Sequence, residues 1–439
     1  MRLLFVLPEY PPDHGGGIAT VYGALLPELV RLGHDVHAVV GSAYVSGRAS
    51  FEDHGVTVSY LEPERYHRLL PAYSRYAAMP VLQRHLAAAR AMWEQTDGGA
   101  GFDRVEVVEW GLLFAPWICA ESPPSLVRLH GSSGQISEYD TMPGEEGAEQ
   151  VIRIIETALL PHAAALSTSS RINAAYWEER LGRQTAIVPP PLPPSAPLST
   201  KGQGTTAFVA GRLQEWKGPR VLADALRLLG DGAPVVEWAG RAVMQPRTGV
   251  AYDRYLATEY ADIWNRKLIH LGQISPAEVQ RRQREAKLVI IPSLWDVYNL
   301  TAVEAMARGS LVVCSDGAGA ADIMEDGVNG FVFRAGDARA LADATLRALD
   351  LSSSERKAII MSAAETVREQ LDPARIAALV SAELIQATAV GHAPVSLTGA
   401  VAPGEVVPKD AHLARLPLRD LIVHAAGRIR TKLSQSIRS

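Results

Sequence analysis

The stretch 288–309 constrains the fold of this chain more than any other. An apolar run at 288–291 ends at a proline, a loop then carries Asp296 and Asn299, and strong helix formers fill 301–308 before a glycine. A short apolar run before a proline is typical of a buried strand, and a glycine after the last helix former is a common stop signal. The stretch therefore predicts a strand, a loop and a helix, the repeating unit of parallel α/β sheets.

The loop brings polar groups to the start of this predicted helix. The first backbone N–H groups of a helix, here near Leu300 and Thr301, have no partner within the helix and attract anions such as phosphate. Glu304 lies one turn inside and could accept hydrogen bonds from a ribose, while Asp296 could accept from sugar hydroxyls. This arrangement suits a nucleoside diphosphate that carries a sugar. An ordinary strand-loop-helix with solvated acids explains the same spacing.

The stretch 291–331 resembles the donor-site signature of the retaining GT-B glycosyltransferases of glycosyltransferase family 4. That pattern has two Glu eight residues apart with a Gly between them. Here Asp296 stands at the first Glu, Asn299 at the Gly and Glu304 at the second Glu, within a matching Glu-Ala-Met-Ala-x-Gly run. The resemblance implies that Glu304 holds the ribose and Asp296 the donor sugar. Asn tolerates unusual backbone angles better than most residues, so the loop is expected to keep its conformation.

A second motif carries two cations. Gly211, Arg212 and Lys217 follow a predicted strand at 206–210 and precede a predicted helix. The planar fork of Arg and the point charge of Lys suit a diphosphate, although a pair of surface charges is the alternative. The Gly-Arg-Leu…Lys-Gly spacing resembles the second donor motif of the same family. The resemblance implies that Arg212 and Lys217 neutralise the leaving diphosphate.

The N-terminal half opens with a strand-helix-strand pattern at 2–40, which predicts a parallel sheet. The glycines before the helix, Gly16 and Gly17, let backbone approach a ligand, or form a flexible turn. The resemblance implies that this pair lines the cleft between the domains near the donor diphosphate.

Ligands in open α/β sheets bind at the carboxyl ends of strands. His130 ends the predicted strand 125–129 and is the best candidate to contact the reacting sugar, because imidazole donates or accepts near neutral pH. The resemblance supports this role, while a structural histidine is the alternative. Glu109, at another strand end, is a weaker candidate for acceptor hydroxyls, and Gln273 follows a strand that could lie along the nucleobase.

The proline-rich run 189–197 stays extended and marks a domain boundary. The fold class that the resemblance implies is α/β of GT-B type, with two Rossmann-like α/β/α domains facing across a cleft and a basic C-terminal extension. The expected divisions are an N-terminal acceptor-side domain at 1–190, a hinge at 191–198, a nucleotide-sugar-binding domain at 199–372, a helix packing back toward the N-terminal domain at 373–388, and a linker with a basic amphipathic tail at 389–439.

Composition limits the partners. The formal net charge of −5 argues against a nucleic-acid partner. Cys119 and Cys314 form no metal or disulfide pattern and are expected to be reduced core residues of a cytoplasmic protein. No apolar run approaches the ~18 residues that span a bilayer. The tail 411–439 is basic with interleaved apolar residues, so it could lie on an anionic surface at the inner membrane face; a docked helix or a disordered tail are the alternatives.

These patterns, with the resemblance, predict a glycosyltransferase. It would move a hexose-type sugar from a nucleoside diphosphate sugar, UDP or GDP, to a hydroxyl of a glycan or lipid-linked acceptor, with retention, in cell-surface polysaccharide or glycolipid assembly. No cofactor is expected, and no metal, because the chain has no Asp-x-Asp motif. A sugar-nucleotide epimerase of the same architecture and a non-catalytic nucleotide-sugar-binding protein are the alternatives.

Overall fold

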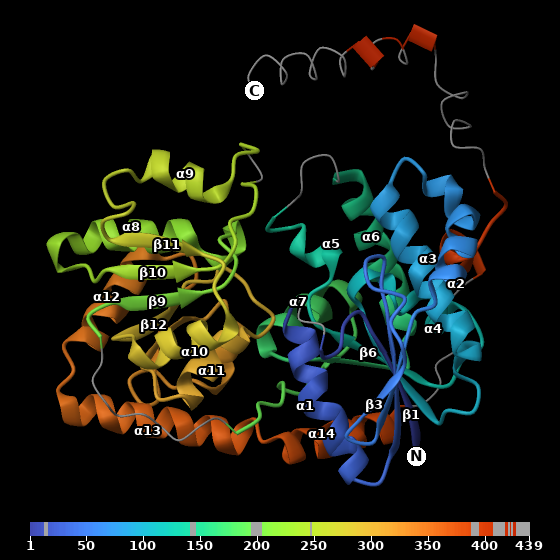
Figure 1. The fold of residues 1–439 in the computed structure, drawn as a ribbon, viewed down its shortest axis with the longest axis horizontal. Coiled ribbons are helices and arrows are strands. Elements are labelled where there is room, and N and C mark those ends of the chain that lie inside the picture. Colours follow the sequence, from blue (N-terminus) through green and yellow to red (C-terminus); the bar gives the residue numbers. More distant parts are fainter. Residues whose placement is uncertain are drawn as a thin grey trace.

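A computed structural model of the chain describes residues 1–12, 16–140, 146–194, 204–245, 248–387 and 395–406, together with Leu418, Arg419, Ile422, Ala425 and Ala426. Two parallel-stranded sheets stand side by side in separate lobes, each covered by helices on both faces (Figure 1).

The N-terminal lobe is built on an eight-stranded sheet in the order β3-β4-β2-β1-β5-β6-β7-β8. Among these, β3 pairs antiparallel to β4 and the others pair in parallel. The strands are β1 (Arg2–Leu7), β2 (Asp35–Val40), β3 (Phe51–Asp53), β4 (Val56–Tyr60), β5 (Arg104–Val108), β6 (Ser125–Leu129), β7 (Ala165–Thr168) and β8 (Ala186–Ile187).

The helices of this lobe cover both faces of the sheet. They are α1 (Gly17–Arg31), α2 (Pro63–Leu69), α3 (Pro80–Gln95), α4 (Ala115–Cys119), α5 (Ser133–Ile136), α6 (Glu146–Leu159) and α7 (Arg171–Leu181). Strand β1 explains the two-sided cover: Leu4 and Val6 enter one apolar cluster, while Leu3, Phe5 and Leu7 enter the other. A strand buried on both faces must be apolar throughout, which is the pattern at 2–7.

The C-terminal lobe holds a six-stranded parallel sheet in the order β11-β10-β9-β12-β13-β14. Its strands are β9 (Ala207–Ala210), β10 (Val236–Ala239), β11 (Leu268–Gly272), β12 (Leu288–Ile291), β13 (Val312–Ser315) and β14 (Phe331–Phe333). Its helices are α8 (Pro219–Leu229), α9 (Tyr252–Glu259), α10 (Pro276–Glu285), α11 (Leu300–Ala307), α12 (Ala338–Leu349) and α13 (Ser353–Gln370).

Helix α14 (Pro373–Gln386) leaves the C-terminal lobe and packs beside α1 in the N-terminal lobe (Figure 1). Its residues Ile376, Ala377, Val380 and Leu384 are buried in the N-terminal core. The helix ties the two lobes together through apolar burial. A short helix α15 (Val395–Val401) then packs on α4.

Specific contacts also join the lobes beside the cleft. The Tyr139 ring stacks on Trp295 at 5.1 Å between centroids. The Ser170 hydroxyl donates to the Val297 carbonyl at 2.5 Å, and Arg171 donates to Asp322 through its backbone and its guanidinium. Apolar stacking and hydrogen bonds therefore hold the lobes at a defined separation.

Prolines divide the helical region at 63–95. It consists of α2, a 3-10 segment at Leu70–Tyr76 and α3, because Pro71 and Pro80 lack the N–H that a continuous helix needs. Within the described ranges, the structure has no helix of the length and apolar character that crossing a membrane requires. Most of the predicted tail, 411–439, lies outside the described residues.

Candidate active site

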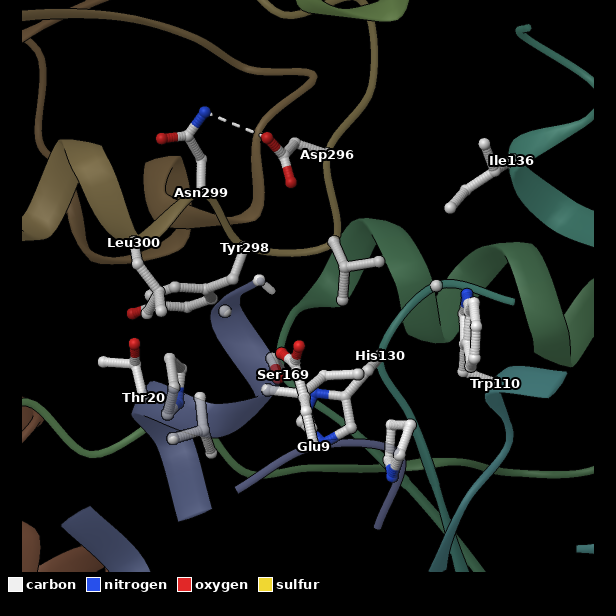
Figure 2. Close-up of a pocket in the computed structure, with 18 of the residues that line it drawn as sticks. Glu9, Thr20, Trp110, His130, Ile136, Ser169, Asp296, Tyr298, Asn299 and Leu300 are labelled. Atoms are coloured by element: carbon white, nitrogen blue, oxygen red, sulfur yellow. Dashed lines mark hydrogen bonds between the residues drawn. The ribbon is translucent and has the colours of Figure 1, made fainter. Parts of the chain in front are cut away.

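A cavity of about 700 Å³ lies between the two lobes. Figure 2 shows Asp296, Asn299 and Leu300 on one side of it, with Glu9, Thr20, His130 and Ser169 opposite. The N-terminal lobe and hinge contribute Pro8, Glu9, Gly16, Gly17, Ile18, Thr20, Val21, Ser42, Tyr44, Val45, Trp110, His130, Gly131, Ile136, Ser169 and Pro190. The C-terminal lobe contributes Arg212, Trp216, Lys217, Arg241, Asp296, Val297, Tyr298, Asn299, Leu300, Thr301 and Glu304.

The sheet order explains where the cavity lies. The order in which successive strands are added to each sheet reverses at a switch point, between β1 and β5 in one lobe and between β9 and β12 in the other. Loops at the carboxyl ends of strands diverge there and leave a crevice. Glu9 follows β1, Arg212 follows β9 and Asp296 follows β12, so these side chains enter the same crevice.

Asn299 organises the tip of α11. It is the N-cap residue and has a left-handed backbone with φ +70°, so the conformation expected from Asn at this position is confirmed. Its side-chain oxygen accepts from the Ala302 N–H at 3.3 Å, and its side-chain amide donates to Asp296 at 2.9 Å. One residue therefore caps the helix and orients the carboxylate, while the first helical amides, at Leu300 and Thr301, lie at the cavity.

The two cationic-motif residues lie at the same end of the cavity. The Lys217 ammonium forms an ion pair with Asp296 and sits over the Trp216 ring at 4.2 Å. Loss of solvent contact and the neighbouring Arg241 charge lower the pKa of Arg212, whose guanidinium makes no ion pair within the part of the chain that the structure describes. Two mutually repelling guanidinium groups beside a helix tip form a site that an anion would stabilise.

Backbone contacts hold the two motifs against each other. The Leu294 N–H donates to the Trp216 carbonyl at 2.8 Å. Gly218 has φ +74°, and a Cβ at this position would lie 1.7 Å from the Pro292 carbonyl oxygen. Only glycine permits this approach, which brings Lys217 to the loop that carries Asp296.

Glu304 also lines the cavity. Its carboxylate is about one quarter exposed and pairs with Arg308 at 3.2 Å, one turn along α11. An i,i+4 pair of this kind holds the carboxylate along the helix face.

Gly17 faces the tip of α11 from the opposite lobe. A Cβ on Gly17 would lie 3.3 Å from Leu300 Cδ1, so the lobes approach closely at this point. Glu9 lies beside this glycine turn and accepts from the Ala19 N–H at 3.1 Å, which caps the start of α1.

His130 ends a buried polar chain that starts on α14. Arg128 donates to Glu383 on that helix at 3.1 Å and to Glu106 at 2.8 and 3.2 Å. Glu106 in turn accepts from the Tyr22 hydroxyl at 2.6 Å, and the Tyr22 oxygen lies 3.3 Å from His130 Nε2. This series of hydrogen bonds therefore links α14 to the cavity.

These hydrogen bonds determine which nitrogen of the His130 ring carries the proton. The Tyr22 proton is committed to the Glu106 carboxylate, so the Tyr22 oxygen acts as the acceptor for His130 Nε2–H. Burial and the Arg128 charge lower the pKa of His130 to about 3, so the ring is neutral at physiological pH. Its Nδ1 then carries a lone pair that can accept a hydrogen bond.

Glu109 does not reach the cavity, so its suggested role toward acceptor hydroxyls is wrong. The side chain is fully buried, and its carboxyl accepts from the Gly131 N–H at 2.6 Å. Burial raises the pKa of Glu109 to about 7. The Glu109 carboxyl therefore holds the loop that follows His130 in place.

The predicted site residues are otherwise concentrated in the cavity. His130, Arg212, Lys217, Asp296, Gly16, Gly17, Asn299, Leu300, Thr301 and Glu304 line it. Gly211 precedes Arg212 with φ +153°, and Gln273 is exposed beyond β11; neither belongs to the described cavity lining.

Sequence reasoning missed other lining residues, including Glu9, Tyr44, Trp110 and Arg241. Glu9, Trp110 and Arg241 each follow a strand end within two residues, a signal that could have identified them. Tyr44 lies in a loop and had no such signal.

A helix tip and two cations at a cleft between two parallel-sheet lobes are typical of GT-B glycosyltransferases that use a nucleotide sugar. Comparison with family models supports the same class of protein. Residues 16–193 match the family model described as glycosyl transferase 4-like domain, and residues 196–366 match that of glycosyl transferases group 1. The chain belongs to this glycosyltransferase family.

Similar proteins include an uncharacterised glycosyltransferase of Methanocaldococcus jannaschii, 22% identical over 75% of this chain and 84% of that protein. A D-inositol 3-phosphate glycosyltransferase of Corynebacterium glutamicum is 31% identical over 35% of this chain and 36% of that protein. Among solved structures, sucrose-phosphate synthase from Thermosynechococcus elongatus has a TM-score of 0.65 at 18% identity and covers 88% of this chain and 98% of that one. Anabaena HepE in complex with UDP and glucose has a TM-score of 0.61 at 16% identity and covers 88% and 99%.

Proposed function

We propose that this protein transfers a hexose-type sugar from UDP-hexose to a hydroxyl of a glycan or lipid-linked acceptor, with retention of anomeric configuration. The observation that carries the proposal is the grouping of Arg212, Lys217 and the α11 tip at one end of the cavity, with Asp296 and Glu304 beside them. The cations and amides suit a diphosphate, and the carboxylates suit ribose and sugar hydroxyls. The complex of HepE with UDP and glucose supports UDP over GDP as the first nucleotide to test.

In this proposal the chemistry is electrostatic. The bond between the sugar C1 and the diphosphate oxygen breaks while C1 bonds to the acceptor oxygen on the same face. The acceptor proton passes to the leaving phosphate oxygen. Arg212, Lys217 and the amides at Leu300 and Thr301 stabilise the charge that builds on the diphosphate, and such prepositioned dipoles are often the largest catalytic contribution.

The surrounding side chains hold the sugar. Asp296 accepts from its hydroxyls once Lys217 turns toward the diphosphate, and His130 Nδ1 accepts from a further hydroxyl. Neither carboxylate needs to attack C1, so the proposal requires no covalent sugar–enzyme intermediate and no metal ion. Trapping of a sugar adduct on a carboxylate, or loss of turnover in EDTA that manganese restores, would contradict it.

We also propose a place of action at the inner membrane face in cell-surface polysaccharide or glycolipid assembly. The support is the basic composition of 411–439 and two exposed apolar residues in it, Leu418 and Ile422. Co-sedimentation with vesicles that contain phosphatidylglycerol, compared with neutral phosphatidylcholine vesicles, tests this part.

A thermal-shift panel of nucleoside diphosphates and their sugars tests the donor. A bound ligand raises the melting temperature by mass action, so UDP and UDP-hexose should shift it and GDP should not. Proton NMR of the transferred sugar then reports the anomeric configuration. A product with inverted anomeric configuration would contradict retention. If no nucleotide shifted the melting temperature, the proposed donor site would be wrong.

A second candidate is a non-catalytic nucleotide-sugar-binding protein. It is favoured by the engagement of Asp296 with both Lys217 and Asn299, which commits the carboxylate within the protein. Binding of UDP-hexose without hydrolysis or transfer to any acceptor would select this candidate.

A further inference from the structure

The charge in the cavity is divided between the lobes. Its three Lys and Arg side chains, at 212, 217 and 241, all come from the C-terminal lobe. On the N-terminal side, the only charged side chain among the described lining residues is the carboxylate Glu9. An anion held at this lining would therefore meet a negative charge, and it would meet no Lys or Arg among the lining residues that the structure describes.

An aromatic surface stands on the same side. Tyr44 is 60% exposed, an unusual exposure for a tyrosine in a cavity, and its ring lies 6.4 Å from that of Trp110. Behind them, His85 packs edge-on against both rings, at 6.1 and 5.4 Å. The Tyr44 N–H donates to the Ser42 hydroxyl at 3.1 Å, and Ser42 N–H donates to the Val45 carbonyl at 3.0 Å. These bonds hold the loop that presents the exposed ring.

We propose that the N-terminal side of the cavity is a subsite for an acceptor whose reacting part is an uncharged sugar ring, held against Tyr44 and Trp110 and selected against phosphorylated acceptors by Glu9. The proposal rests on the proposed glycosyltransferase function. The apolar C–H face of a pyranose matches an aromatic ring, while its hydroxyls can donate to Glu9 and His130. A phosphate at the same place would be repelled and would leave its charge uncompensated.

A cation lies close to this surface, because the Arg84 guanidinium lies over the Tyr44 ring at 5.5 Å. Its Nε donates to the Pro80 carbonyl at 3.1 Å, and the residue is not part of the described lining. The guanidinium therefore packs against one face of the Tyr44 ring.

The test compares p-nitrophenyl glucoside, galactoside and mannoside with their 6-phosphates, using the UDP-hexose that the thermal-shift panel selects. The kcat/KM for a neutral glycoside should be at least about tenfold higher than the kcat/KM for its 6-phosphate. Binding to the UDP-saturated protein is measured in parallel by tryptophan fluorescence. Equal or better use of a phosphate, or no binding of any neutral glycoside to the UDP complex, would overturn the inference.

Three variants and one control test which residues cause the preference for neutral glycosides. Tyr44→Ala should raise the KM for the neutral glycoside about tenfold, while Tyr44→Phe should stay within about twofold, because the ring makes the contact. Glu9→Gln keeps an oxygen for the Ala19 N–H and removes the charge, so it should narrow the preference for neutral over phosphorylated glycosides. Leu32→Ala, on an exposed residue after α1, is the control and should match wild type.

An unchanged KM in Tyr44→Ala, or an unchanged preference in Glu9→Gln, would count against the inference. Two further measurements distinguish a failure of the acceptor inference from a failure of the proposed function. They are the thermal shift by UDP and the slow hydrolysis of UDP-hexose without acceptor. If the thermal shift and the hydrolysis are both observed but the neutral glycosides are not preferred, the acceptor class is wrong and the proposed function stands. If both are absent, the proposed function itself fails.

Discussion

Lys217 and Asp296 form an ion pair in the cavity, although the two residues belong to different donor motifs. The side chains are mostly buried, 18% and 11% exposed, so neither charge is well solvated without the other. In the proposed function, a diphosphate that binds at the α11 tip competes with Asp296 for the Lys217 ammonium. Ligand binding would then release the carboxylate for sugar hydroxyls.

Asp296→Asn tests this coupling. We expect kcat to fall by about 100-fold or more, because the charge that orients the sugar is lost at the reacting centre. UDP should bind as tightly as to wild type, or more tightly, since Lys217 no longer has a competing partner. Steady-state kinetics and calorimetry measure the two effects.

The matched control is Asp326→Asn, which breaks the surface pair with Arg347 outside the cavity lining. Exposed pairs contribute little, so this variant should keep wild-type kinetics. Wild-type kcat in Asp296→Asn would contradict a catalytic role for the carboxylate.

Gly17→Val tests the close approach of the lobes. The added side chain would meet Leu300, which already lies 3.3 Å from an ideal Cβ position. We expect kcat/KM to fall about tenfold, because small displacements of the reacting groups are costly. Adding Leu300→Ala should recover part of the loss, as measured by kinetics on the double variant.

Gly147→Val provides a comparison at another helix start, where nothing lies within 4 Å of the added Cβ. It should leave kcat/KM unchanged. Additive losses in the Gly17→Val, Leu300→Ala double variant would show that the two residues do not interact across the cleft.

Tyr22→Phe tests the tautomer of His130. Nitrogen-15 NMR of the wild type should show a protonated Nε2 and an unprotonated Nδ1, with assignment from His130→Gln. In Tyr22→Phe the Nε2 partner is lost, so the spectrum should move toward a mixture of tautomers. One neutral hydrogen bond contributes about 1 kcal/mol, so kcat should fall about fivefold.

Tyr10→Phe is the control for this variant. Tyr10 is also fully buried in the N-terminal core and donates to a carboxylate, Asp53, at 2.8 Å. It should lose comparable stability without changing the His130 spectrum. An Nδ1-protonated His130 in the wild type would contradict the assignment.

Glu156 makes stability depend on pH. It is fully buried beside Ser132, and burial raises its pKa to about 8. The folded state keeps a proton that the unfolded state releases near its ordinary value, so this contribution is complete below about pH 4 and is lost as pH rises through 8. Glu109, with its pKa near 7, acts in the same direction.

We therefore expect the melting temperature of Glu156→Gln to equal or fall below that of wild type at pH 5 and to exceed it at pH 9. The amide is neutral at both pH values and stays compatible with the buried site. Differential scanning calorimetry across this range measures the difference. Parallel wild-type and variant curves would show that Glu156 does not titrate in this window.

Local signals in the sequence predicted much of the candidate site. The strand at 288–291, the helix that follows the loop and the unusual backbone of Asn299 depend on neighbouring residues, and the structure has each of them. The same holds for β9 and the turn that carries Lys217. Periodicity and turn chemistry act over a few residues, so these elements could be predicted.

Other features needed the packed molecule. Glu109 and His130 both follow strands, but only His130 faces the cavity, because the Gly131 N–H draws the Glu109 carboxyl into the core. Tyr44 and Glu9 reach the site from loops without a motif. The Lys217–Asp296 pair joins residues 79 positions apart, a contact that no local rule specifies.

The sequence by itself determined the parallel α/β elements, the donor motifs and their order, because hydrophobic period, prolines and glycines act locally. The tertiary structure decided which side of the cleft is cationic, which rings are exposed and which nitrogen of His130 is free. Those properties arise from contacts between segments that are distant in the sequence. The packing of α14 on the N-terminal lobe is one such contact, and it acts through burial and hydrogen bonding.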